Sequence, residues 1–183
     1  MRSRLVALGA AATLLALTGC SGSRADAGLP PVQVLEQPAA SAGGACILWD
    51  YAFIRDTIGV TFTVAGSDQV DDTSTCVVQT ENGDYPNLAL SVVESTRADA
   101  NLFLQDLMPA KATRVKGLGR AGYRLQSGAS GDHGPSIEIT WLSEAAQLQT
   151  LKFTFPKGAK QAQADQMSTK LASLAKAMNT TKG

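Results

Sequence analysis

A glycine-rich run at residues 117–122 has the composition of a phosphate-binding loop. Its sequence, GLGRAG, matches the G-x-G-x-x-G pattern of dinucleotide sites. Such a site needs the run between a strand and a helix, so that the backbone approaches a pyrophosphate at the helix N-terminus. Residues 123–126 alternate as a strand instead. We therefore expect a glycine-rich turn that enters a strand, and no nucleotide cofactor.

His133 is the single histidine of the chain and lies among small residues at 127–135. It would have to be the base of any Ser-His-Asp site, and the chain has no G-x-S-x-G sequence to mark the nucleophile. We expect a solvated histidine in a hairpin. The glycine-rich turn and this loop are the candidate binding loops, with residues Gly117, Leu118, Gly119, Arg120 and His133.

Metal and nucleic-acid chemistry find little support. The chain has three aspartates close together, Asp68, Asp71 and Asp72, whose oxygens could bind calcium. The EF-hand spacing is absent, so we expect an acidic turn and no metal site.

The charged residues are balanced in number, with 16 Lys plus Arg and 16 Asp plus Glu. Removal of Arg2 and Arg4 with a signal peptide leaves 14 against 16, a net charge of −2, which is no footprint for nucleic acid.

The first twenty residues predict export and lipidation. Arg2 and Arg4 precede an apolar run at residues 5–17, which is too short for a membrane span. Residues 17–20, Leu-Thr-Gly-Cys, resemble the lipobox of bacterial lipoproteins. The resemblance implies cleavage after residue 19 and acylation of Cys20, which anchors the chain to a membrane. The alternative is a secreted protein with a stray cysteine.

Residues 20–45 are rich in Gly, Ala, Ser and Pro, which is typical of a flexible tether. Val32, Val34 and Leu35 could instead add an edge strand. We expect three parts, namely a signal peptide at 1–19, the acylated cysteine and tether at 20–45, and a single globular domain at 46–183.

Cys46 and Cys76 are the two cysteines of the expected domain. Because export leads to an oxidising compartment, we predict that they form a disulfide. Two buried free thiols are the alternative. A redox pair is not expected, since the chain lacks C-x-x-C.

Periodicity predicts an α+β fold. Ile47, Tyr51, Ile54 and Ile58 form a stripe on a helix that opens at Cys46 and ends at Gly59. Further helices are expected after a capping box at 96–99, and at 159–178. Strand patterns cover residues 61–64, 74–80, 87–94, 122–126, 136–142 and 148–155. We expect an antiparallel sheet of about five or six strands packed against two or three helices.

The assembled motifs resemble a class of actinobacterial lipoproteins of unknown function. The likeness rests on the lipobox, the tether, the helix that opens at Cys46, the strand that carries Cys76, and the turn at 115–119. It implies a disulfide-bonded α+β domain on the outer face of the cytoplasmic membrane, in the cell envelope. Proteins of this class often have an acidic residue directly after this turn. This chain has Arg120 at that position.

Three functions fit this sequence. The first is a non-enzymatic module that binds an envelope lipid, glycan or protein through the sheet face or the candidate loops. The second is a secreted hydrolase that uses His133. The third is a structural or adaptor lipoprotein that has only a protein partner.

Overall fold

The computed structural model describes residues 37–94 and 99–180. The chain divides into two units, Met1–Val34 and Leu35–Gly183, and the described residues belong to the second. The predicted signal peptide at 1–19 and the predicted lipidation site Cys20 lie outside the described residues.

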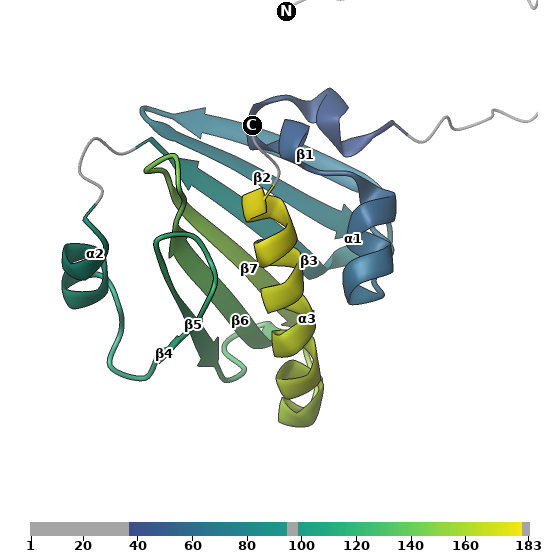
Figure 1. Ribbon diagram of the computed structural model, residues 1–183. Coiled ribbons are helices and arrows are strands. Elements are labelled where there is room, and N and C mark those ends of the chain that lie inside the picture. Colours follow the sequence, from purple (N-terminus) through teal and green to yellow (C-terminus); the bar gives the residue numbers. More distant parts are fainter. Residues whose placement is uncertain (1–36, 95–98, 181–183) are drawn as a thin grey trace, which may run out of the picture. The chain divides into compact units, whose positions relative to one another are not determined.

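The described part is an antiparallel sheet with helices, as the periodicity predicts (Figure 1). The sheet has seven strands in the order β1-β2-β3-β7-β6-β5-β4. Two sets of consecutive strands, β1 to β3 and β4 to β7, join where β3 pairs with β7. The strands are β1 (Val64–Val70), β2 (Thr73–Thr80), β3 (Gly83–Val93), β4 (Thr113–Arg114), β5 (Ala121–Ser127), β6 (His133–Leu142) and β7 (Leu148–Pro156).

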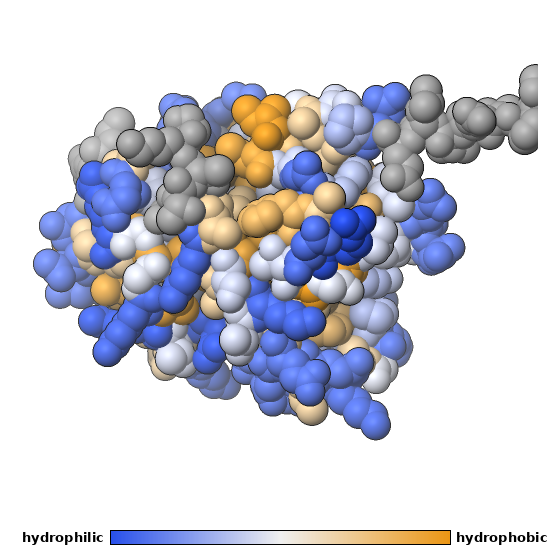
Figure 2. All heavy atoms as spheres, turned by 45° about the vertical axis from the view of Figure 1, so that its right-hand side comes forward, coloured by the Kyte–Doolittle hydropathy of each residue, from blue (hydrophilic) through white to orange (hydrophobic). Residues whose placement is uncertain are grey.

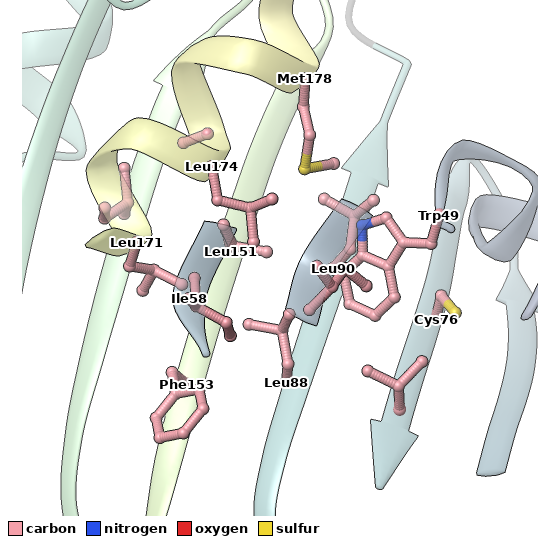
Figure 3. Packing of buried hydrophobic residues seen from close by; sticks show 14 of the residues in the cluster. Trp49, Ile58, Cys76, Leu88, Leu90, Leu151, Phe153, Leu171, Leu174 and Met178 are labelled. Atoms are coloured by element: carbon pink, nitrogen blue, oxygen red, sulfur yellow. The ribbon is translucent and has the colours of Figure 1, made fainter. Parts of the chain in front are cut away.

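Three α-helices accompany the sheet, namely α1 (Tyr51–Ile58), α2 (Ala100–Asp106) and α3 (Gln161–Thr180). The main core lies between the sheet and the helices α1 and α3. Leu171 and Leu174 of α3 lie over Leu151 of β7, and Trp49 lies over Leu90 of β3 (Figure 3). These side chains are at most 3% exposed, so they supply much of the hydrophobic stabilisation of the domain.

The folded part begins earlier than the sequence predicts. Two short 3-10 helices, η1 (Ala39–Ala42) and η2 (Gly44–Leu48), precede α1. Ala39 and Ala45 are buried in the main core. The prediction of a flexible tether is therefore wrong for residues 37–45, because small residues that are typical of linkers pack closely against the sheet here.

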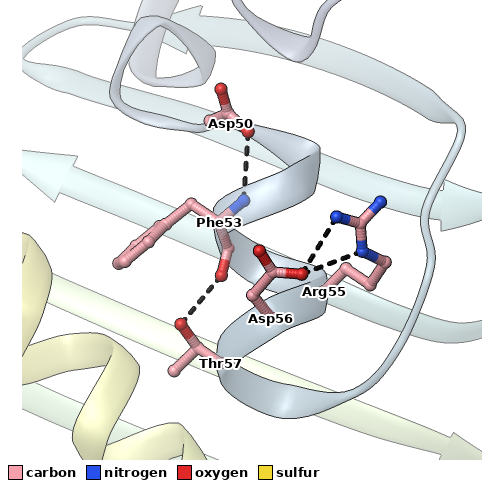
Figure 4. A network of polar contacts seen from close by, with 5 residues as sticks. All are labelled: Asp50, Phe53, Arg55, Asp56 and Thr57. Carbon is pink, nitrogen blue, oxygen red and sulfur yellow. Dashed lines mark hydrogen bonds and ion pairs between the residues drawn. The ribbon is translucent and has the colours of Figure 1, made fainter.

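Helix α1 starts five residues later than predicted. The Asp50 carboxylate accepts a hydrogen bond from the Phe53 backbone N–H at 3.0 Å and caps the first turn (Figure 4). Ile47, which the apolar stripe placed inward, lies in η2 and is 67% exposed. Trp49 takes the buried position instead. The predicted end is confirmed, since Gly59 adopts the left-handed conformation with φ of 79°.

Strand β1 takes up the first part of the predicted acidic turn, and the rest is a turn as predicted. Asp68 lies within β1, and Asp71 and Asp72 follow it in the turn to β2. Sequence alternation missed this strand because six of its seven residues are exposed. Within residues 37–94 and 99–180, no group of three or more His, Cys, Asp or Glu side chains is arranged to hold a metal ion.

Candidate functional site

The second face of the sheet, opposite α1 and α3, carries a row of hydroxyl groups. Register places one residue of each of six strands side by side across this face. Neighbouring strands lie about 4.8 Å apart, so the row spans about 24 Å. We call it the hydroxyl row. Five of its members carry hydroxyls, namely Tyr123, Thr140, Thr150, Ser91 and Thr75, and the β1 member, Asp68, carries a carboxylate. Tyr123 and Thr140 are buried, at 5% and 3% exposed.

Hydrogen bonds connect the β5 end of the hydroxyl row. Thr150 Oγ1 donates to Thr140 Oγ1 at 3.3 Å, and Thr140 Oγ1 donates to Glu138 Oε1 at 3.5 Å. The Tyr123 hydroxyl also hydrogen-bonds to Thr140. Burial raises the pKa of Tyr123 above its ordinary value, the bond to Thr140 opposes this shift, and the charge of Glu138 adds to it. Tyr123 therefore stays a neutral hydroxyl at physiological pH.

Glu138 and Lys152 place two charges beside the hydroxyl row. They face each other on β6 and β7, yet the described ion pairs are only Arg55–Asp56 and Arg120–Glu144. Glu138 is half-buried and Lys152 is exposed. Both charged groups are thus available to a ligand that lies on this face.

Aromatic residues border both ends of the second face. At one end Phe103 of α2 stacks on Tyr123 at 5.5 Å between ring centroids, in a small second core with Leu142. At the other end the rings of Tyr85 and His133 lie 5.7 Å apart. Strand β6 runs from one border to the other.

The predicted glycine-rich turn does enter a strand. Leu118 is buried in the main core, and Gly119 has φ of 52°. A Cβ at Gly119 would collide with the carbonyl of Leu142, so glycine is required there. Arg120 donates from its backbone to Leu142 O at 2.8 Å and from its guanidinium to Glu144 O at 2.7 Å. This turn therefore braces the β6–β7 hairpin.

The structure does not bring the two candidate loops together. Arg120 contacts the residues at the end of β6, whereas His133 begins that strand. Ten strand residues separate the loops by about 30 Å. His133 is half-buried, and its Nδ1 lies 2.6 Å from Gly134 O. Gly117 is exposed in the glycine-rich turn at the far end of β6. Of the candidate residues, His133 borders the second face, where its ring lies beside that of Tyr85.

A separate pocket opens beside β1. Its volume is about 440 Å³, and it lies among η1, the start of α1 and the residues that enter β1. Apolar side chains form most of its wall, and Thr63 Oγ1 is buried there without a hydrogen-bond partner among the described residues. The lining residues are Gln37, Pro38, Ser41, Ala42, Tyr51, Thr63, Val64 and Ala65.

Exposed apolar side chains also occur around α1. Ile47, Leu48 and Phe53 are each more than a third exposed. Figure 2 shows hydrophobic surface on this side of the molecule, bordered by hydrophilic residues.

None of the helices in the described residues combines the length and apolar content of a membrane span.

The predicted disulfide is confirmed. Cys46 of η2 and Cys76 of β2 are bonded, with Cα atoms 5.0 Å apart and both side chains fully buried. The bond fastens η2 to the sheet, which fits a chain that folds in an oxidising compartment.

Sequence reasoning named the sheet face but missed its residues. The signal was present in part, because each of β2, β3, β6 and β7 has at least one Thr or Ser at an outward position, between the apolar residues that point to the main core. Which of them lie side by side depends on strand order and register, and neither can be read from one sequence.

Comparisons with known proteins do not assign a family. No protein-family model matches the chain, and no curated protein matches it. A crystal structure from Bacteroides thetaiotaomicron VPI-5482 at 1.50 Å resolution is similar to part of the chain, with a TM-score of 0.33 and 14% sequence identity. The similarity covers 55% of this chain and 38% of that chain. A TM-score this low does not establish a shared fold.

Proposed function

We propose that the chain is a cell-envelope lipoprotein, anchored through Cys20, whose folded part binds an elongated glycan on the second face of the sheet without catalysing a reaction. The hydroxyl row is the observation that carries this proposal. The lipobox supports the anchor, and the disulfide supports a location outside the cytoplasm.

The chemistry of the second face suits a hydroxylated ligand. Thr and Ser hydroxyls both donate and accept hydrogen bonds, as sugar hydroxyls do. Glu138 can accept from two neighbouring sugar hydroxyls, and Lys152 can donate to ring or carboxylate oxygens. Tyr85 and His133 offer ring faces to the apolar side of a sugar.

The shape of the second face suits a chain-like ligand. The part of the hydroxyl row that is not buried, from Thr150 to Asp68, crosses four strands and spans about 14 Å, which is longer than a single sugar. A surface site of this kind gains affinity from many modest contacts.

Thermal unfolding with soluble fragments of envelope glycans tests the proposal. A fragment at 100 times its dissociation constant should stabilise the chain by about 2.7 kcal/mol. Glu138→Gln and Lys152→Gln should each lower this stabilisation measurably, and the two together should lower it further. Glu81→Gln and Lys157→Gln make the same chemical changes in exposed turns and should leave it intact.

Two results would count against glycan binding. The first is the absence of a shift with every fragment tested. The second is a shift that survives both substitutions on the second face, because the ligand would then bind elsewhere. Envelope lipids and membrane extracts, tested in parallel, would reveal a different ligand class.

A further inference from the structure

Strand β1 forms a long, exposed edge of the sheet. Among residues 37–94 and 99–180 it pairs only with β2, and six of its seven residues are exposed. Edge strands are commonly protected by Lys, Pro or a bulge, and β1 has none of these. Its single charge is Asp68, whose carboxylate accepts from the backbone N–H of Gln69 at 2.9 Å. The opposite edge, β4, has two residues and offers no comparable strand.

We propose that two copies of this chain pair through β1, antiparallel and centred on Ser67, so that the two sheets continue into one. This inference goes beyond the proposed function and does not depend on it. The partner is a second copy of the chain, because the side chains of β1 are complementary to those of an antiparallel copy in this register.

The first part of the complementarity lies on the second face. Val64 and Val70 both point to that face, are 46% and 61% exposed, and stand three residues either side of Ser67. Antiparallel pairing about Ser67 therefore sets each Val64 opposite Val70 of the other copy. Asp68 then lies opposite Gly66, where a side chain would meet nothing within 4 Å. The two carboxylates stay about 8 Å apart on the diagonal.

The second part lies at the pocket beside β1. Ala65 and Gln69 point to the helix-covered face, because their partners in β2 do so. Pairing about Ser67 sets Gln69 of one copy opposite Ala65 of the other, which lines the pocket. One register thus covers the exposed valines and sets Gln69 of each copy against Ala65 in the pocket wall of the other.

Disulfide trapping in cells tests the register directly. Residue 67 meets its own copy with Cα atoms about 5 Å apart, which a disulfide can bridge, so Ser67→Cys should give a cross-linked dimer on a non-reducing gel. Gln69→Cys is the matched control, since its two copies lie about 14 Å apart along the strands. Residue 67 lies opposite Cys76 in the β1–β2 register, whereas residue 69 lies opposite Ser74. Peptide mapping must therefore show a bond between the two copies of residue 67, and not one formed by exchange with the Cys46–Cys76 disulfide.

Charge substitutions in the Ser67→Cys background test the valine pairs. Val64→Lys should lower the cross-linked fraction, because the underlying affinity falls on the order of ten-fold when two valine pairs are lost. Adding Val70→Glu should restore it, since Lys and Glu then meet across the interface. Leu102→Lys, at an exposed apolar residue of α2, should have no effect. Asp68→Asn should strengthen pairing about two-fold by removing the repulsion.

The unsubstituted chain provides a measurement that needs no variant. The interface is at the small end of specific interfaces, so we expect a weak dimer that forms between about 10 μM and 1 mM in sedimentation experiments. A monomer throughout this range overturns the proposal. So does equal cross-linking of the Ser67→Cys and Gln69→Cys chains, or a failure of Val70→Glu to rescue Val64→Lys. Any of these three results would leave the edge to a peptide of another protein or to no partner.

Discussion

Loss of the disulfide should destabilise the domain by an amount that follows from its position in the chain. Cys46 and Cys76 are 30 positions apart. In the chain-entropy model, the disulfide stabilises the fold by restricting the unfolded chain. Breaking a bond that closes a loop of this length lowers the free energy of unfolding by about 3.6 kcal/mol. For a unit of about 150 residues, the entropy of unfolding converts this into a fall in Tm of about 11 °C.

Reduction of the unsubstituted chain isolates the effect of the cross-link. The reduced chain keeps both sulfur atoms in the core, whereas the Cys46→Ala/Cys76→Ala chain also loses their packing. We expect about 3.6 kcal/mol for reduction and a larger loss for the double substitution. Urea unfolding at neutral pH, with and without reductant, gives both numbers.

The outcome that would refute this reasoning is a small effect of reduction. A loss below about 1 kcal/mol would mean that the unfolded chain already holds residues 46 and 76 close together. Equal losses for the reduced chain and the double substitution would show that the sulfur atoms add nothing to the packing of the core.

Three substitutions probe other parts of the fold. Gly119→Ala should destabilise the chain by more than about 2 kcal/mol in urea unfolding, because the new methyl group meets the Leu142 carbonyl; a neutral result would show that the turn moves freely. Asp50→Ala should cost about 1 kcal/mol by removing the cap on the Phe53 N–H, and an unchanged midpoint would argue against the cap. Tyr123 has a raised pKa when folded, so its contribution is complete below about pH 10 and falls as pH rises towards the folded pKa. Tyr123→Phe should flatten the decline of Tm above pH 10, and identical profiles for both chains would contradict this assignment.

Strong periodicity predicted most of the fold correctly. Alternation placed Ile137, Ile139 and Trp141 inward on β6, and all three are fully buried. Helical spacing likewise predicted the core-facing residues of α3, and Leu171 and Leu174 are fully buried. These elements can be predicted from the sequence because one face of each is apolar and the other is not.

The errors occur where local pattern and tertiary packing disagree. Ile47 fits a helical stripe, but the Asp50 cap starts the helix after it. Residues 37–45 look like a linker because Ala, Gly and Ser are small, and the sheet uses that smallness for close packing. β1 has no apolar alternation because its side chains remain exposed at the sheet edge.

The candidate site was predictable only in part. His133 attracted notice as the single histidine, and the structure places it at the border of the second face. Glu138 and Lys152 are ordinary residues in the sequence, 14 positions apart. Only the pairing of β6 with β7 makes them neighbours.

The single junction between β3 and β7 has a consequence for how the chain folds. Strands β1 to β3 are joined by tight hairpins, while the β3–β7 ladder unites residues as far apart as Asn87 and Thr154. Contacts of such long range form slowly, because a long loop must close first. Both disulfide cysteines precede β3. The covalent link can therefore close before the strands that complete the sheet have paired.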